Sequence, residues 1–184
     1  LSSSDNPQNA KKINVYNQLA QVLVGHDVTG NIQNFDQDGD ITAGGTKMRE
    51  CFFLNFARLL SKDEIKKGSF TTEIYVDGLS EEPSGSVTVS DYGAETSFKV
   101  NSPTGEYGIL YTSSATPNTD SGVGHIYYQA GIAVLTASVF SRATGSGGAF
   151  GAPTTSSASL EGVLTGSNIQ TFADGVRNRL ANTE

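Results

Sequence analysis

The chain has few of the side chains on which most enzyme and metal sites depend. It has one cysteine, Cys51, no tryptophan and two histidines, His26 and His125, in 184 residues. A single cysteine excludes an internal disulfide and a cysteine-based metal cage. Because Cys51 lies in an apolar run, we expect a small buried hydrophobe rather than a nucleophile. Two histidines without a cysteine pair also argue against an ordinary zinc site.

Positive charge is scarce as well. Lys and Arg number 12 against 19 Asp and Glu, which gives a net charge of −7. Broad contact with nucleic acid needs clustered Lys and Arg, so we expect no nucleic-acid partner. No run of about 18 apolar residues is present and the first residues are no signal sequence, so we expect no membrane partner. The chain begins at Leu1 rather than at Met, and we expect a processed product or a piece of a longer protein.

The residues that are abundant indicate a mainly β (α+β) fold. Gly alone contributes 21 residues, and Ser and Thr add to a polar, turn-rich composition. Short β-branched or aromatic segments alternate with Gly, Pro, Asp and Ser turns, which favours antiparallel hairpins. The predicted strands are 69–76, 86–90, 96–100, 107–112, 124–128 and 132–136. We expect the last two to form a hairpin at the centre of an antiparallel sheet or sandwich.

An amphipathic helix is predicted near each end of the chain. In the first, residues 9–24, apolar side chains recur at helical spacing and Gly25 is a plausible stop. In the second, Ser167 and Gln170 match a capping box, and the apolar face extends to Leu180. A helix of about 14 residues is marginal alone, so we expect this one to dock on the sheet or on a neighbouring subunit.

Three regions follow from this organisation. We expect a β-rich domain with the N-terminal helix over residues 1–143, a flexible Gly/Ser/Thr arm over 144–160, and a C-terminal docking helix over 161–184. The Phe-rich segment 48–60 fits either a strand or a helix by its periodicity, and we favour a strand followed by a turn.

An acidic loop carries the most specific chemical pattern. Asn34, Asp36, Asp38 and Asp40 alternate along a turn, and Gly39 stands where a twelve-residue calcium loop has its glycine. Alternate carboxylates in a tight turn can converge on one hard cation. Position 12 is Gly45, however, where that loop needs a bidentate Glu. We therefore expect a solvated turn and no cofactor, and keep calcium as the alternative.

Catalytic patterns are missing from the sequence. No Gly-x-Ser-x-Gly elbow accompanies the histidines. The glycine-rich stretch 145–151 lacks the Lys of a phosphate loop, and Pro153 stands where its helix should begin. Carboxylate pairs such as Glu81-Glu82 lie in charged, turn-like surroundings where solvation is the default. We expect no enzyme.

Several phrases of the sequence resemble a known family. Residues 14–35, which begin Asn-Val-Tyr-Asn-Gln-Leu-Ala-Gln-Val-Leu-Val-Gly, residues 52–70 and residues 125–140 resemble structural proteins of contractile-tailed bacteriophages that infect cyanobacteria. Residues 172–180 resemble a stretch that precedes a further C-terminal portion in those proteins. The resemblance implies a virion component of the tail, baseplate or neck, assembled in the host cytoplasm, and it implies no active-site residues.

The leading hypothesis is thus a structural subunit that contacts other virion proteins as a homo-oligomer in a symmetric assembly. A receptor- or glycan-binding module of the same particle, braced by calcium, is the alternative. Its aromatic platform would be made of Tyr75, Tyr107, Tyr111, Tyr127 and Tyr128. A wall-degrading enzyme, with a carboxylate buried in a cleft, is the third hypothesis.

Overall fold

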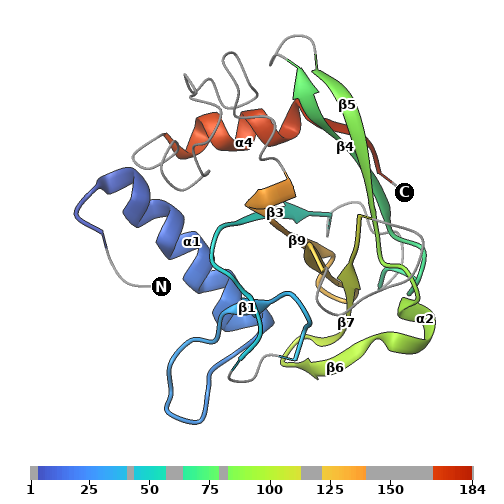
Figure 1. Ribbon diagram of the computed structural model, residues 1–184. Helices are drawn as coiled ribbons and strands as arrows, with labels where there is room; N and C mark the ends of the chain where they lie inside the picture. Colours follow the sequence, from blue (N-terminus) through green and yellow to red (C-terminus); the bar gives the residue numbers. More distant parts are fainter. Residues whose placement is uncertain are drawn as a thin grey trace.

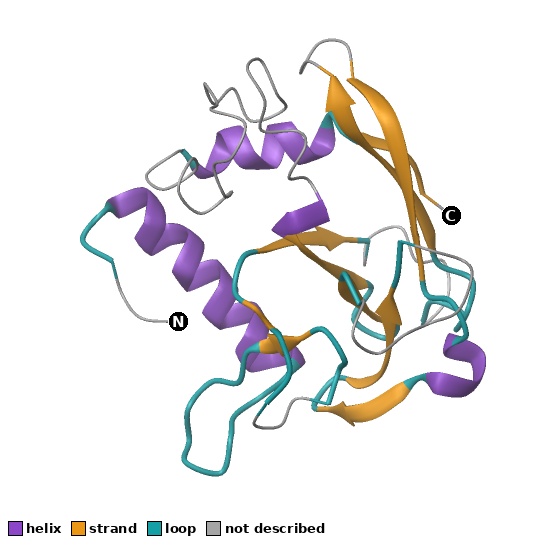
Figure 2. Cartoon of the chain, viewed as in Figure 1, coloured by secondary structure: helices purple, strands orange, loops and turns teal. Residues whose placement is uncertain are grey.

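The computed structural model describes residues 4–40, 44–56, 64–78, 83–112, 122–139 and 168–183. They form a mainly β structure with antiparallel sheets and a few helices (Figure 2). The elements in chain order are α1 (Pro7–Leu23), β1 (Phe35–Asp36), β2 (Lys47–Met48), β3 (Cys51–Asn55), β4 (Thr71–Gly78), β5 (Pro83–Ser90), α2 (Ala94–Ser97), β6 (Lys99–Ser102), β7 (Gly105–Leu110), β8 (Gly124–Tyr127), β9 (Ile132–Thr136), α4 (Ile169–Arg177) and β10 (Leu180–Thr183).

Helix α1 has local start and stop signals. The Asn6 side chain accepts hydrogen bonds from the backbone N–H groups of Gln8 and Asn9, and Pro7 occupies the first turn, where its missing N–H costs nothing. The helix ends before Gly25, which has φ +80°. An ideal Cβ at Gly25 would lie 3.0 Å from Cγ of Pro103, so the end of α1 sits tightly against the turn between β6 and β7.

The main sheet has five strands in the order β3-β9-β8-β7-β6, and every neighbouring pair is antiparallel. The hairpin β8–β9 confirms the predicted one, and all four residues of β8 are buried. The other sheets are small: β10, β4 and β5 form a three-stranded one, and β1 pairs with β2.

Both faces of the main sheet are covered. Side chains on one face, including Tyr107, Tyr127 and Val134, pack with Tyr16, Ala20 and Leu23 of α1 and with the β1–β2 sheet. Neighbouring residues in the same strands, such as Ile126 and Leu135, point to the opposite face and pack with the β4–β5 hairpin and with Val176 of α4. Figure 1 accordingly shows α1 and the β4–β5 ribbon on opposite sides of the main sheet.

Two predicted elements are corrected. The strand expected over 96–100 begins only at Lys99, because Gly93 with φ +72° starts the helical turn α2, whose backbone and hydroxyl groups bond back to the Gly93 carbonyl. At the C-terminal end, Asn168 caps α4, with its side chain accepting from the Gln170 N–H. Leu180 lies not on a helix but in β10, paired with Ile74.

Some predictions fall on other parts of the chain. The arm over 144–160, Ser167 and the end of the Phe-rich segment, from residue 57 on, lie outside the described residues. Among the helices that the structure describes, none has the length and apolar character needed to cross a membrane.

Candidate functional site

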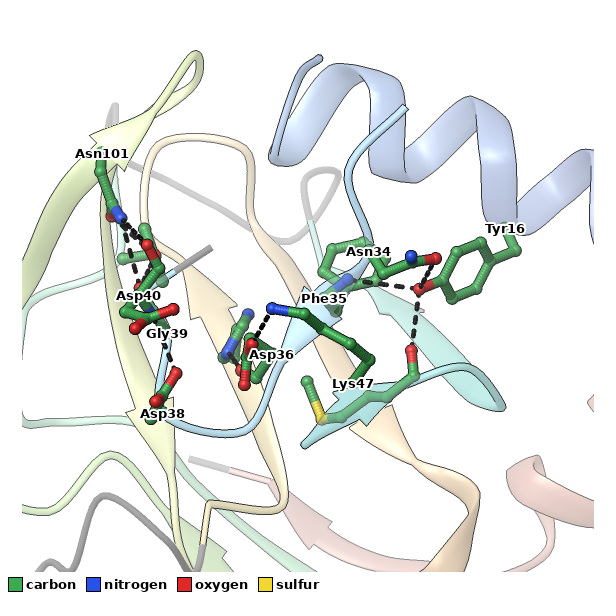
Figure 3. Close-up of polar contacts among 12 residues, drawn as sticks. Tyr16, Asn34, Phe35, Asp36, Asp38, Gly39, Asp40, Lys47 and Asn101 are labelled. Carbon is green, nitrogen blue, oxygen red and sulfur yellow. Dashed lines mark hydrogen bonds and ion pairs between the residues drawn. The ribbon is translucent and has the colours of Figure 1, made fainter. Parts of the chain in front are cut away.

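The acidic loop, defined as residues 34–40, lies against the α1-facing side of the main sheet (Figure 3). It includes β1 and turns at Gly39, which has φ +70°, a conformation that glycine adopts without strain. The Asp40 N–H donates to Oδ1 of Asp38 at 3.0 Å. The turn thus has the local geometry that its Asp-Gln-Asp-Gly sequence predicts.

Three side chains of the main sheet hold the acidic loop. Nε2 of His125 lies 2.6 Å from the Asp36 carbonyl oxygen. The Tyr107 hydroxyl lies 2.6 Å from the Gly39 carbonyl oxygen, and Nδ2 of Asn101 donates to the carbonyl oxygens of Gly39 and Asp40 at 3.3 and 3.2 Å. Because these side chains come from β8, β7 and β6, the sheet fixes the backbone from which the carboxylates project.

His125 is a buried structural group. A carbonyl oxygen can only accept, so Nε2 carries the proton and donates to Asp36; Nδ1 then accepts from the Tyr127 hydroxyl, 3.2 Å away. Complete burial lowers the pKa of His125 to about 4, so the ring is neutral at pH 7. The structure places His125 in the packed interior.

The predicted cation ligands separate into two sets. Asp36, Asp38 and Asp40 each place a carboxylate oxygen within 4.8 Å of those of the other two. Asn34 does not join them, since its Oδ1 faces the Tyr16 hydroxyl of α1 at 3.4 Å (Figure 3). Tyr16 also donates to the Met48 carbonyl oxygen at 2.8 Å and accepts from the Phe35 N–H at 3.2 Å. Asn34 and Tyr16 therefore join α1 to the small sheet.

Asp36 is the buried member of the cluster, with no exposed surface. One carboxylate oxygen, Oδ2, makes an ion pair with Lys47 from β2. The other, Oδ1, is buried without a hydrogen-bond partner among the described residues. Burial raises the pKa of the Asp36 carboxyl; Lys47 opposes that shift, and the charge of Asp38 adds to it.

Sequence spacing offered no signal for the groups that support the loop. Tyr107 and His125 are 68 and 89 residues from their partners in the loop. No sequence pattern links Lys47 to Asp36, and only the fold brings the two into an ion pair.

A second buried carboxylate lies on the other face of the sheet. Asp91 accepts hydrogen bonds from the N–H groups of Gly68 and Phe70 at 2.7 and 3.0 Å, and from the Tyr128 hydroxyl at 2.9 Å. Burial raises the pKa of Asp91, and these hydrogen bonds oppose the shift. With three donors from fixed elements, Asp91 joins the start of β4 to the end of β8.

Cys51 forms no reactive centre. Its Sγ lies 3.5 Å from the Met48 carbonyl oxygen. Burial raises the pKa of the thiol, and the negative charge of Glu50 raises it further, so the thiolate that a nucleophile needs is disfavoured.

Comparisons with protein-family models, with curated proteins and with solved structures found no match for this chain.

Proposed function

We propose that the protein is a structural subunit of a bacteriophage virion, in the tail, baseplate or neck, that acts through protein–protein contacts and not as an enzyme. Two kinds of support stand behind the proposal. One is the resemblance of residues 14–35, 52–70 and 125–140 to structural proteins of contractile-tailed phages. The other is that several reactive side chains of the described residues are buried and make internal hydrogen bonds.

Internal contacts or burial occupy three groups that could do chemistry, His125, Asp91 and Cys51, and this observation carries the proposal. His125 bonds the Asp36 backbone and the Tyr127 hydroxyl, Asp91 accepts from three donors, and the pKa of the Cys51 thiol is raised. A general base or nucleophile must reach a substrate. In the described part of the chain these groups serve packing instead.

The arrangement of the tyrosines weighs against the glycan-binding alternative. Of the five expected to form an aromatic platform, Tyr107, Tyr111, Tyr127 and Tyr128 are buried, and Tyr75 is half-buried. Tyr107 and Tyr127 stack on each other with ring centroids 5.0 Å apart. A sugar needs an exposed ring face to stack on, and four of the five rings do not offer one.

The helices supply the contact surfaces in this proposal. We infer that α1 is an amphipathic docking helix that buries Tyr16, Ala20 and Leu23 against the sheet. Its outer side carries Val15 and Val22, which are 38% and 55% exposed and lie seven residues, or about two turns, apart on one side. We infer that α4 is likewise a docking helix, which buries Val176 against the core. A neighbouring subunit that covers the outer side of α1 would bury its exposed valines.

Immunolabelling of the encoding virus tests the location. Gold-labelled antibodies raised against the purified chain should decorate particles at the tail, baseplate or neck in electron micrographs. Antibodies depleted on the same chain are the control and should give no label. Particles that contain the chain nowhere would overturn the proposal.

Sedimentation velocity tests the contact surface. The chain should associate as its concentration rises, and Val15→Glu/Val22→Glu should weaken that association at least tenfold. Val28→Glu is the matched control, because Val28 is a fully exposed valine outside α1. A chain that stays monomeric at all concentrations, or a double variant that associates like the wild type, would contradict the assembly role of α1.

A further inference from the structure

The three carboxylates of the acidic loop lie closer together than isolated surface acids would. Asp36, Asp38 and Asp40 share a region in which their ligand atoms are within 4.8 Å of one another. Like charges at this distance repel, and the backbone cannot relax freely because His125, Tyr107 and Asn101 hold it. The fold therefore keeps these three carboxylates close together.

A second observation concerns hydrogen bonding at the centre of this cluster. Oδ1 of Asp36 is buried and accepts no hydrogen bond from any described residue. A buried carboxylate oxygen without a partner is costly and calls for a ligand. Lys47 binds the other oxygen, Oδ2, so the ion pair does not satisfy Oδ1.

We propose that the acidic loop binds one calcium ion through Oδ1 of Asp36 and the carboxylates of Asp38 and Asp40. Carboxylate oxygens are the ligands that this hard cation prefers. Asp40 is exposed and Asp38 is half-buried, so water can reach the ion from their side and complete its coordination. This proposal goes beyond the assembly function and does not depend on it.

Gly45 explains how the site differs from the calcium loop that the sequence suggested. It occupies position 12 and lies against the Asp36 carboxylate, where an ideal Cβ would be 2.6 Å from Oδ1 and 2.8 Å from Oδ2. No side chain fits there, so position 12 supplies no bidentate ligand. Asn34, at position 1, faces Tyr16 instead. With fewer protein ligands, we expect a dissociation constant on the order of 10⁻⁴–10⁻³ M.

Calorimetric titration tests this site. The full chain, treated with EDTA and dialysed, is titrated with CaCl₂ at constant ionic strength. We expect one bound ion per chain and a melting temperature that rises with calcium concentration. Magnesium, which requires a tighter octahedral shell, should bind more weakly. The absence of binding at about 10 mM CaCl₂, or tighter binding of MgCl₂, would overturn the assignment.

Matched variants locate the ion. Asp38→Asn/Asp40→Asn should weaken calcium binding at least tenfold, whereas Asp5→Asn, an exposed acid near the N-terminus, should leave it unchanged. Circular dichroism of each variant checks the fold. If the double variant binds calcium as well as the wild type does, the ion does not lie in the acidic loop.

A Lys47 variant tests whether the Asp36 carboxylate binds a calcium ion or is satisfied by the Lys47 ammonium alone. Lys47→Gln removes the charge that competes with calcium for Asp36. We expect the variant to melt at a lower temperature without calcium, to bind calcium more tightly and to recover its stability when calcium is added. If calcium neither binds more tightly nor restores stability, Lys47 is itself the counter-ion and the proposal fails.

Discussion

Asp91 and the donors around it show how single residues hold the two sheets together. The carboxylate accepts hydrogen bonds from the N–H groups of Gly68 and Phe70, which precede β4, and from the hydroxyl of Tyr128, which follows β8. Asp91 itself has no exposed surface. Bulk water therefore does not reach the carboxylate.

Replacing Asp91 by alanine should lower the free energy of unfolding by about 3 kcal/mol, because three buried donors lose their acceptor together. Tyr128→Phe, which removes one of the three hydrogen bonds and keeps the ring, should cost only about 1 kcal/mol. Urea unfolding followed by circular dichroism measures both. Equal losses in the two variants would mean that the carboxylate does not act as the common acceptor.

At the residue scale, the sequence predicted which carboxylates come together, but it did not predict which way the neighbouring side chains point. The spacing of Asp36, Asp38 and Asp40 was enough to place their carboxylates together. The same spacing included Asn34, which turned to Tyr16, because a helix packed nearby offers its amide a partner. The tyrosines could not be sorted into exposed and buried from an alternating pattern alone, since both faces of their sheet are covered.

The elements depend on local signals at their ends, and α1 illustrates this most directly. Asn6 accepts from two of the N–H groups that a helix start leaves without intrahelical partners. Asn6→Ala should therefore lower the free energy of unfolding by about 1 kcal/mol.

Asn14→Ala provides the comparison, because Asn14 lies exposed inside the same helix. There the change should be neutral or slightly stabilising, since alanine has the higher helix propensity. Thermal and urea denaturation of the two variants measure the difference. A larger loss in Asn14→Ala than in Asn6→Ala would contradict the capping role.

Elements with strong turn signals were the ones that the sequence predicted. The hairpin β8–β9 follows from apolar strands on either side of Gln129-Ala130-Gly131, and Gly131 has φ +62°. The predicted strand over 96–100 was wrong at its start, because backbone and hydroxyl bonds to Gly93 favour a helical turn in Thr96 and Ser97. Leu180 was assigned to a helix because its spacing fits one, but pairing with Ile74 places it in a strand. Local hydrogen bonds decided the first case, and a tertiary strand pairing decided the second.

At the scale of the whole molecule, the structure combines a central five-stranded sheet with coverings that differ between its faces. Long-range contacts such as the bridge between Ser90 and Tyr111 join the layers. No periodicity in the sequence encodes which hairpin packs on which face, so this arrangement lay beyond sequence reasoning.

The layered arrangement predicts an order of hydrogen exchange. Amides of β8 should exchange most slowly, because this strand is buried and paired on both sides. Those of β6 and β10 should exchange fastest among the strands of their sheets. Both are edge strands among the described residues, and each shows an irregular register with the strand beside it. Mass spectrometry of exchanged peptides measures this order at neutral pH. Slower exchange in the β4–β5 hairpin than in β8 would place the most stable unit of the molecule in the smaller sheet, because exchange from a strand core tracks the free energy of opening it.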